Sequence, residues 1–406
     1  MRSQSGNIPR AIKIHIRDIL NLPEAGIRPQ ASLVYSLIQA YNLLSHMHLV
    51  PSTKATDEDL KSFHSSDYIK YLQQINDNTD LEKHNEDELE YYGLGKEPVL
   101  YYCCDNYSNK VESDILTAYD CPLITHIYDF VKTIAGGSLT AAQHLVDDTA
   151  NIAVNWCGGW HHAQRDKAEG FCYVNDIVIA IQKLREKYDK VLYIDLDIHH
   201  GDGVENAFLV TKKVLTLSFH KHGPGFYPGS GAIADTGSGN GKLYSINVPL
   251  KDGIKDDLFF KIFDSVTSKV LHVFRPNAVV VQCGADCLNK DPMGTFNLTP
   301  KGLGECICKV LAWKLPLLFL GGGGYNLTNT ARYWTYLTSI ILDQKIPSEI
   351  PEHRYFTSYG PDFDLHITPG CRRDFNTEEY IEDVIKIIHK NLDDMVSLPS
   401  ENDLNT

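Results

Sequence analysis

The stretch YIDLDIHHGDG, residues 193–203, begins in the apolar run VLYI and contains three aspartates and two histidines. In an extended chain successive side chains alternate between two faces, so Asp195, Asp197 and His199 share one side, each about 6.5–7 Å from the next. A buried carboxylate is costly unless it is paired or binds a metal. The pattern therefore predicts a buried strand that ends in a metal or catalytic site; a solvated strand end is the alternative.

Around this stretch, short apolar runs alternate with segments whose apolar residues recur every three or four positions. This alternation predicts one α/β domain with a doubly wound, mostly parallel sheet. The strands are expected at 152–156, 191–195, 214–219, 278–282 and 315–320. The helices are expected at 32–46, 128–147, 175–188, 256–274, 299–314, 329–342 and 378–392. Residues 78–117 are polar and aperiodic, which predicts a long surface excursion.

Composition limits the class of protein. The chain has 406 residues, of which 43% are apolar and 22% charged, as in globular proteins. It has no apolar run of about 18 residues and no apolar core in its first residues, so we expect neither a membrane span nor a secretory signal. The net charge of −14 argues against general nucleic-acid binding and suits a basic partner. The ten cysteines include no Cys-x-x-Cys pair, which predicts reduced thiols and Asp or His as metal ligands.

Polar residues gather where the five expected strands end, and the carboxyl ends of parallel strands line the ligand crevice of such sheets. Asp286 follows the strand at 278–282 and is a candidate third ligand beside Asp197 and His199. Three protein ligands leave a coordination position open, as in catalytic zinc sites. A helix-capping role for Asp286 is the alternative.

Two further motifs lie at the same edge. His161 and His162 follow two glycines, and each ring is expected to pair with a spare aspartate that orients it. The tetraglycine 321–324 has neither the lysine nor the Ser/Thr of a phosphate-binding loop. We expect it to let the backbone approach the site and to direct the Tyr325 hydroxyl inward.

Five blocks resemble the zinc-dependent class I histone deacetylases, most closely the isoform-eight branch. They are NWCGGWHHAQRDKAEGFCYVNDIVIAI (155–181), YIDLDIHHGDGVENAF (193–208), SFHKHGPGFYPGSG (218–231), QCGADCLNKDPMG (282–294) and LGGGGYNLTNTARYWTYLT (320–338). The resemblance runs from about residue 118 to the C-terminus. It implies an arginase-like α/β fold with an eight-stranded parallel sheet, and hydrolysis of acetyl-lysine to lysine and acetate.

The resemblance also implies residue roles. The implied zinc ligands are Asp197, His199 and Asp286. The implied catalytic residues are His161 with its partner Asp195, His162 with its partner Asp202, and Tyr325. The implied substrate-binding residues are Asp120, Trp160, Gly170, Phe171, Tyr227, Met293 and Tyr325, with Pro292 nearby. Two potassium sites are implied, one near Asp195, Asp197, His199 and Ser218, the other near Phe208, Thr211, Val214 and Tyr244.

The chain departs from the family pattern in three places. Tyr227 stands where the family usually has phenylalanine, Gln30 stands where it has a channel arginine (Arg28 is close by), and residues 95–117 look like an insertion. We therefore expect a divergent segment at 1–31, a catalytic domain at 32–395 and a tail at 396–406.

Several alternatives stay open at this stage. A two-metal ureohydrolase is disfavoured because Gly201 and Leu288 occupy positions where that family needs acids. An acetylpolyamine hydrolase and an inactive scaffold are the other readings, and ferrous iron suits the same ligands as zinc. The expected partners are acetylated lysine peptides of histones or other proteins and hydroxamate inhibitors, with no sequence-specific nucleic acid and no membrane. The expected locations are the nucleus and the cytoplasm, with a role in transcriptional repression.

Overall fold

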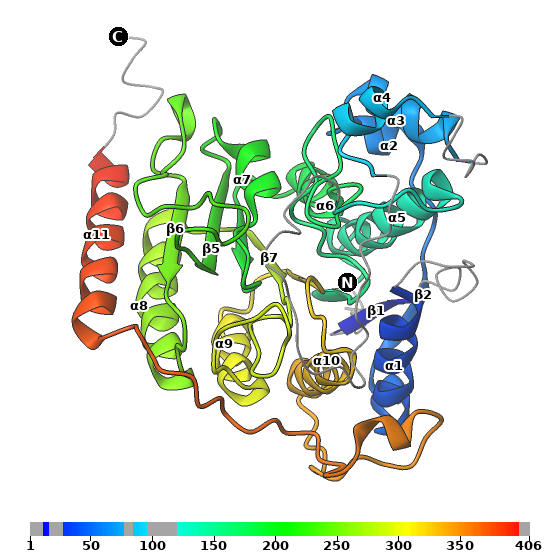
Figure 1. The fold of residues 1–406 in the computed structure, drawn as a ribbon. Helices are drawn as coiled ribbons and strands as arrows, with labels where there is room; N and C mark the ends of the chain where they lie inside the picture. The colour runs from blue at the N-terminus through cyan, green and yellow to red at the C-terminus, as the bar shows by residue number, and fades with distance from the viewer. Residues whose placement is uncertain (1–10, 16–26, 77–83, 96–119, 398–406) are drawn as a thin grey trace, which may run out of the picture.

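The computed structural model describes residues 11–15, 27–76, 84–95 and 120–397. Its centre is a parallel eight-stranded sheet with the order β2-β1-β3-β8-β7-β4-β5-β6 (Figure 1). The strands are β1 (Ala11–His15), β2 (His48–Pro51), β3 (Ile152–Asn155), β4 (Val191–Asp195), β5 (Val214–Lys221), β6 (Ser245–Leu250), β7 (Ala278–Gln282) and β8 (Leu317–Leu320). All residues of β4 and β7 are buried, as expected for strands with both faces covered.

Helices cover both faces of the sheet. They are α1 (Ile27–Ala40), α2 (Asp57–Lys61), α3 (Ser66–Gln74), α4 (Glu86–Tyr91), α5 (Ile127–Val146), α6 (Asp176–Arg185), α7 (Asp202–Phe208), α8 (Asp256–Phe274), α9 (Pro300–Leu311), α10 (Leu327–Ile341) and α11 (Glu378–Ser397). Short 3-10 helices lie at Leu43–His46, Gly239–Gly241 and Phe356–Tyr359. Among the described residues, no helix is long and apolar enough to cross a lipid bilayer.

The two faces of strand β4 contribute to two different cores. Leu192 and Ile194 pack with residues of α1, α8, α9, α10 and α11, whereas Val191 and Tyr193 pack with residues of α5 and α6. This division follows from the alternation of side chains along a strand. It confirms the predicted single-domain α/β fold with a doubly wound parallel sheet.

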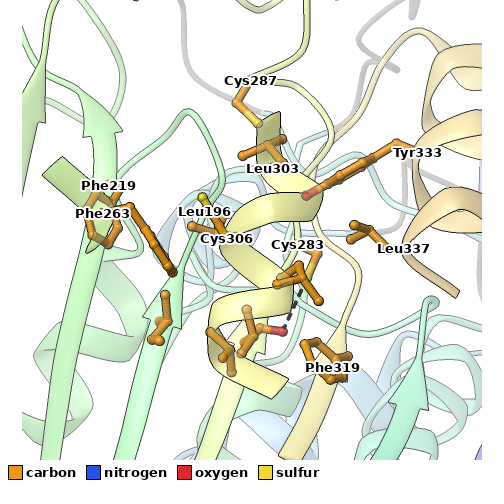
Figure 2. Packing of buried hydrophobic residues seen from close by; sticks show 14 of the residues in the cluster. Leu196, Phe219, Phe263, Cys283, Cys287, Leu303, Cys306, Phe319, Tyr333 and Leu337 are labelled. Carbon is orange, nitrogen blue, oxygen red and sulfur yellow. Dashed lines mark hydrogen bonds between the residues drawn. The ribbon is translucent and has the colours of Figure 1, made fainter. Parts of the chain in front are cut away.

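Figure 2 shows part of the first core, where α9 packs over the sheet. Leu303 of α9 and Phe219 of β5 are fully buried, and so are the thiols of Cys283 and Cys306. All cysteines in the described part of the chain are free, in agreement with the expected reduced thiols. Cys103 and Cys104 lie outside it.

Two predictions about segments were wrong in part. The helix expected at 32–46 ends at Ala40, because Asn42 adopts a left-handed conformation with a φ of 56° before the 3-10 turn. The surface excursion expected at 78–117 contains helix α4, which Asn85 caps and whose Leu89 is buried. Residues 78–83 and 96–117 of that excursion, most of the segment 1–31 and residues 398–406 lie outside the described residues.

Candidate metal centre and active site

Three predicted ligands lie together at the carboxyl ends of β4 and β7. The ligand atoms of Asp197, His199 and Asp286 lie within 4.8 Å of one another, and all three residues are buried. His199 Nδ1 lies 3.1 Å from Asp197 Oδ1 and 3.1 Å from Asp286 Oδ2. The neighbouring strands place them there, because Asp195 at the end of β4 is in register with Gln282 at the end of β7.

The electrostatics of this cluster favour a cation. Burial, and then the charge of Asp197, raise the pKa of Asp286, so the two carboxylates are not easily ionised together. Burial opposes a charge on His199, but its contacts with both carboxylates outweigh burial and raise its pKa to about 10. Two carboxylates and one imidazole are a donor set suited to Zn²⁺ or Fe²⁺, so the residues fit a divalent metal.

Hydrogen-bond donors hold the carboxylates of Asp197 and Asp286 in position. The Gln282 side chain and the Gly323 N–H each donate to Asp197 Oδ2 at 2.9 Å, and the Ile198 N–H donates to Asp286 Oδ1 at 2.9 Å. Gln282 escaped the sequence reasoning because it looked like an ordinary strand residue. Its position at the end of a strand, directly before Cys283-Gly284, is the one sequence feature that indicates a role in the site.

Each predicted histidine meets its predicted aspartate. His161 Nδ1 lies 2.8 Å from Asp195 Oδ2, and His162 Nδ1 lies 2.7 Å from Asp202 Oδ1. The ring centroids of the two histidines are 4.0 Å apart. Tyr193, which the motif did not single out, donates its hydroxyl to Asp195 Oδ2 at 2.7 Å.

The two histidines differ in protonation. Burial opposes a charge on His161, but Asp195 and Asp197 together raise its pKa to about 9. Burial and the charge of His161 lower the pKa of His162 to about 4, despite the hydrogen bond to Asp202. At neutral pH the protein groups therefore favour a protonated His161 beside a neutral His162.

Two carboxylates that sequence reasoning missed anchor the loops of the site. Asp176 accepts the N–H groups of Gly159 (3.0 Å) and Trp160 (2.9 Å), directly before the histidine pair. Asp291 accepts the N–H groups of Tyr325 (2.7 Å) and Asn326 (3.1 Å). Both aspartates are buried. The only signal for Asp176 was a carboxylate at the start of an otherwise apolar helix, DIVIAI.

The tetraglycine brings backbone against the candidate metal ligands. A Cβ at Gly323 would lie 2.1 Å from Asp286 Oδ2 and 3.0 Å from Asp197 Oδ2, so a side chain cannot be accommodated there. The same loop accepts a hydrogen bond from Gln30, whose side-chain amide donates to the Gly324 carbonyl at 3.3 Å. The side chain of Arg28 lies outside the described residues.

Known proteins share much of the sequence of this chain. A profile of the histone deacetylase domain matches residues 26–341. Histone deacetylase 8 of Danio rerio is 47% identical over 367 residues, which cover 90% of this chain and 90% of the relative. Histone deacetylase 8 of Xenopus tropicalis is 46% identical over 367 residues (90% and 92%), and human histone deacetylase 1 is 43% identical over 360 residues (89% and 69%).

The chain belongs to the class I histone deacetylase family. It is a protein-lysine deacetylase, a hydrolase that acts on an amide bond. Members of this family are typically metal-dependent, and the buried cluster described above is the candidate metal site in this deacetylase.

Some of the expected substrate-binding residues of the deacetylase surround the histidine pair. The Gly170 N–H donates to Asp120 Oδ2 at 2.8 Å, and a Cβ at Gly170 would lie 2.4 Å from the His162 ring. The centroid of the Tyr227 ring lies 5.0 Å from that of His162, and the Phe171 ring packs edge-on against Tyr325 at 5.9 Å. Asp120 thus supports the loop of Gly170, a contact that the motif did not predict.

Two other expected residues make different contacts. Trp160 packs edge-on against Phe130 and donates its Nε1–H to the Cys157 carbonyl at 3.0 Å, so it belongs largely to the core. Met293 is 44% exposed and contributes a backbone hydrogen bond to Asp291. No described contact joins either side chain to the histidine pair or the metal cluster.

The two expected potassium sites lie on the β4–β5–β6 side of the sheet. Ser218 is in register with Asp195 across β4 and β5. In the second group, Phe208 ends α7, Val214 begins β5, and the Tyr244 carbonyl accepts the Thr216 N–H at 3.0 Å. Thr211 N–H donates to the Phe208 carbonyl at 3.2 Å. Both potassium sites stay predictions.

Proposed function

We propose that this deacetylase is a zinc-dependent hydrolase of Nε-acetyl-lysine in histone tails or other proteins. The observation that carries the proposal is the buried Asp197–His199–Asp286 cluster beside two histidine–aspartate pairs at one edge of the sheet. Such a combination supplies a cation site and proton-transfer groups together, as the hydrolysis of an unreactive amide requires.

Asp197, His199 and Asp286 would hold the metal through one atom each. A bound divalent cation supplies a Lewis acid for the amide carbonyl and lowers the pKa of a water from 15.7 towards about 7. Zinc is proposed on the donor set, and Fe²⁺ is the alternative that the same donors accommodate.

The residues of the chain supply the remaining chemistry. His162, neutral and oriented by Asp202, takes the proton of the attacking water as the new carbon–oxygen bond forms. It then delivers that proton to the lysine nitrogen as the carbon–nitrogen bond breaks, which releases lysine and acetate. His161 contributes positive charge, and the Tyr325 hydroxyl donates to the oxyanion.

Further assignments complete the proposal. Gly170, Phe171 and Tyr227 would line the path of the acyl-lysine, Asp120 would serve the rim, and Met293 would contact the peptide outside. The potassium sites would stabilise the strand ends, and hydroxamates would bind at the metal. We propose a nuclear and cytoplasmic location and a role in transcriptional repression through histone substrates.

The test combines metal analysis with kinetics on an acetyl-lysine peptide. Asp286→Ala is expected to lose most of its metal and its activity, because it removes one of three ligands. Asp257→Ala, which removes an exposed acid at the start of α8, is the control and should keep both. Wild-type metal content and activity in Asp286→Ala would contradict the metal site.

The same assay separates substrate classes. Activity on the acetyl-lysine peptide should exceed that on an acetylated polyamine when kcat/KM is compared. The reverse order would favour an acetylpolyamine hydrolase, and no activity with a full complement of metal would favour a scaffold.

A further inference from the structure

A groove of about 460 Å³ lies between α3 and α4. None of the residues that line it belongs to the candidate metal centre. Figure 1 shows these two helices side by side at one end of the molecule, next to α2. The groove has an aromatic floor and an acidic rim. The residues that matter here are Asp67, Tyr71, Asp87, Glu88, Tyr91 and Tyr92.

The floor consists of three tyrosine rings in contact. The centroids of Tyr71 and Tyr92 are 4.4 Å apart in a stacked pair, and Tyr91 meets Tyr92 edge-on at 4.9 Å. Tyr91 is 69% exposed, so an aromatic face is available to a ligand. Such faces carry negative potential and attract cations.

The rim carries an excess of negative charge. Three carboxylates, Asp67, Asp87 and Glu88, line the groove with a single cation, Lys70, which lies 3.9 Å from Asp67. Within the described residues, the carboxylates of Asp87 and Glu88 have no ion-pair partner. A positively charged ligand therefore complements the rim as well as the floor.

Tyr71 adds an independent indication of a ligand. It is only 6% exposed, and its hydroxyl is buried without a hydrogen-bond partner in the described part of the chain. Burial and the charge of Glu88 raise the pKa of Tyr71 to about 12, so the hydroxyl stays neutral. A buried polar group without a partner is costly, and a ligand N–H could satisfy this oxygen.

The groove is joined to the candidate active site by a short segment. The Ala168 N–H donates to the Tyr92 carbonyl at 2.9 Å, and Gly170, two residues further, lies against His162. The Cα atoms of Tyr92 and Gly170 are thus on the order of 13 Å apart, allowing 3.8 Å per residue and about 5 Å across the hydrogen bond. An extended peptide covers that distance in about four residues.

We infer that this groove binds a lysine or arginine side chain of the acetylated substrate, three to five residues from the acetyl-lysine. The inference rests on the proposed deacetylase function. The aliphatic part of the side chain would lie on the Tyr91 and Tyr92 rings. Its charged end would lie among Asp67, Asp87 and Glu88 and donate to the Tyr71 hydroxyl.

The test uses acetyl-lysine peptides that differ only in arginine against citrulline, its neutral analogue, at positions three to five on either side. At one of these positions the wild type is expected to prefer arginine about tenfold in kcat/KM, a preference that shrinks as salt is added. The double variant Asp87→Asn/Glu88→Gln and the variant Tyr91→Ala should reduce the preference to within about twofold. Glu90→Gln, which removes one negative charge from the same helix but outside the groove, should retain it.

A short acetyl-lysine amide separates this inference from the proposed function. It cannot reach the groove, so all variants should hydrolyse it like the wild type. If the wild type does not hydrolyse it, the proposed function fails, and fluorescence anisotropy of labelled, unacetylated arginine and citrulline peptides tests the groove directly. Equal kinetics or equal binding of the two peptides by the wild type would overturn the inference, as would an arginine preference that survives in both groove variants.

Discussion

Replacing Gly323 by alanine is expected to weaken metal binding at the candidate site without unfolding the protein. The added Cβ would lie 2.1 Å from Asp286 Oδ2, whereas ordinary contacts begin at 3.4 Å, so the carboxylate or the loop must move by about 1.3 Å. Metal ligands tolerate errors of only about 0.2 Å. We therefore expect metal affinity to fall by at least a factor of roughly 10–100, about 1.4–2.8 kcal/mol.

The assay is a metal titration of the stripped protein, followed by activity and by elemental analysis after dialysis. Gly223→Ala is the matched control, because a Cβ at Gly223 meets no atom within 4 Å. Thermal unfolding of the two metal-free variants reports whether either has lost its fold. Metal affinity of Gly323→Ala within threefold of the wild type would refute the reasoning, since it would show that the ligands need not lie where the loop holds them.

Three further predictions concern single side chains. Tyr325→Phe should lower kcat by roughly 10²–10³ with unchanged metal content, because one donor to the oxyanion is lost; a kcat within threefold of the wild type would exclude that role. Tyr227→Phe should leave the free energy of unfolding unchanged or raise it by up to about 1 kcal/mol in denaturant titration, since the buried hydroxyl has no partner among the described residues. A marked loss of stability would show that the hydroxyl does have a hydrogen-bond partner. His64 accepts the Asn175 N–H at 2.9 Å and burial lowers its pKa to about 4 from 6.5, so protonation favours the unfolded chain. Stability should therefore fall by up to about 3 kcal/mol as the pH drops from 6.5 to 4, and His64→Gln should flatten this part of the pH profile.

The sheet was predictable wherever a strand is buried on both faces. Such strands are continuous apolar runs, as in β4 and β7, and their limits agree with the prediction. Strand β6 was missed because its sequence, SINVPL, mixes polar residues with Pro249. It lies at the edge of the sheet, where proline is tolerated.

Short helices were missed for a different reason. Helices α2, α3, α4 and α7 have nine residues or fewer, too few turns for a clear periodic pattern. Their local signals are caps: Thr56 forms a capping box with Asp59, and Asn85 caps the acidic first turn of α4. Tertiary contacts, such as the burial of Leu89, then stabilise helices that their own length would not.

The site was predictable to the extent that its residues are chemically unusual where they stand. Asp197 and His199 interrupt an apolar pattern, and parallel strands bring Asp286 to the same edge. Gln282 and Tyr193 are uncharged residues of two buried strands. Only the positions of their hydrogen-bonding atoms relative to the carboxylates distinguish them, and those positions depend on the register between strands.

The anchoring aspartates show why motifs alone describe the site incompletely. Loops that approach a buried site carry N–H groups that water cannot reach, so the protein must supply acceptors. Asp176 binds two consecutive N–H groups directly before His161, and Asp291 binds the N–H of Tyr325 and of the next residue. Because consecutive N–H groups fix the direction of the chain, each carboxylate also sets the direction in which the adjacent side chain, His161 or Tyr325, leaves the backbone. Loss of either aspartate would displace His161 or Tyr325 while every residue with a proposed catalytic role remained in the sequence.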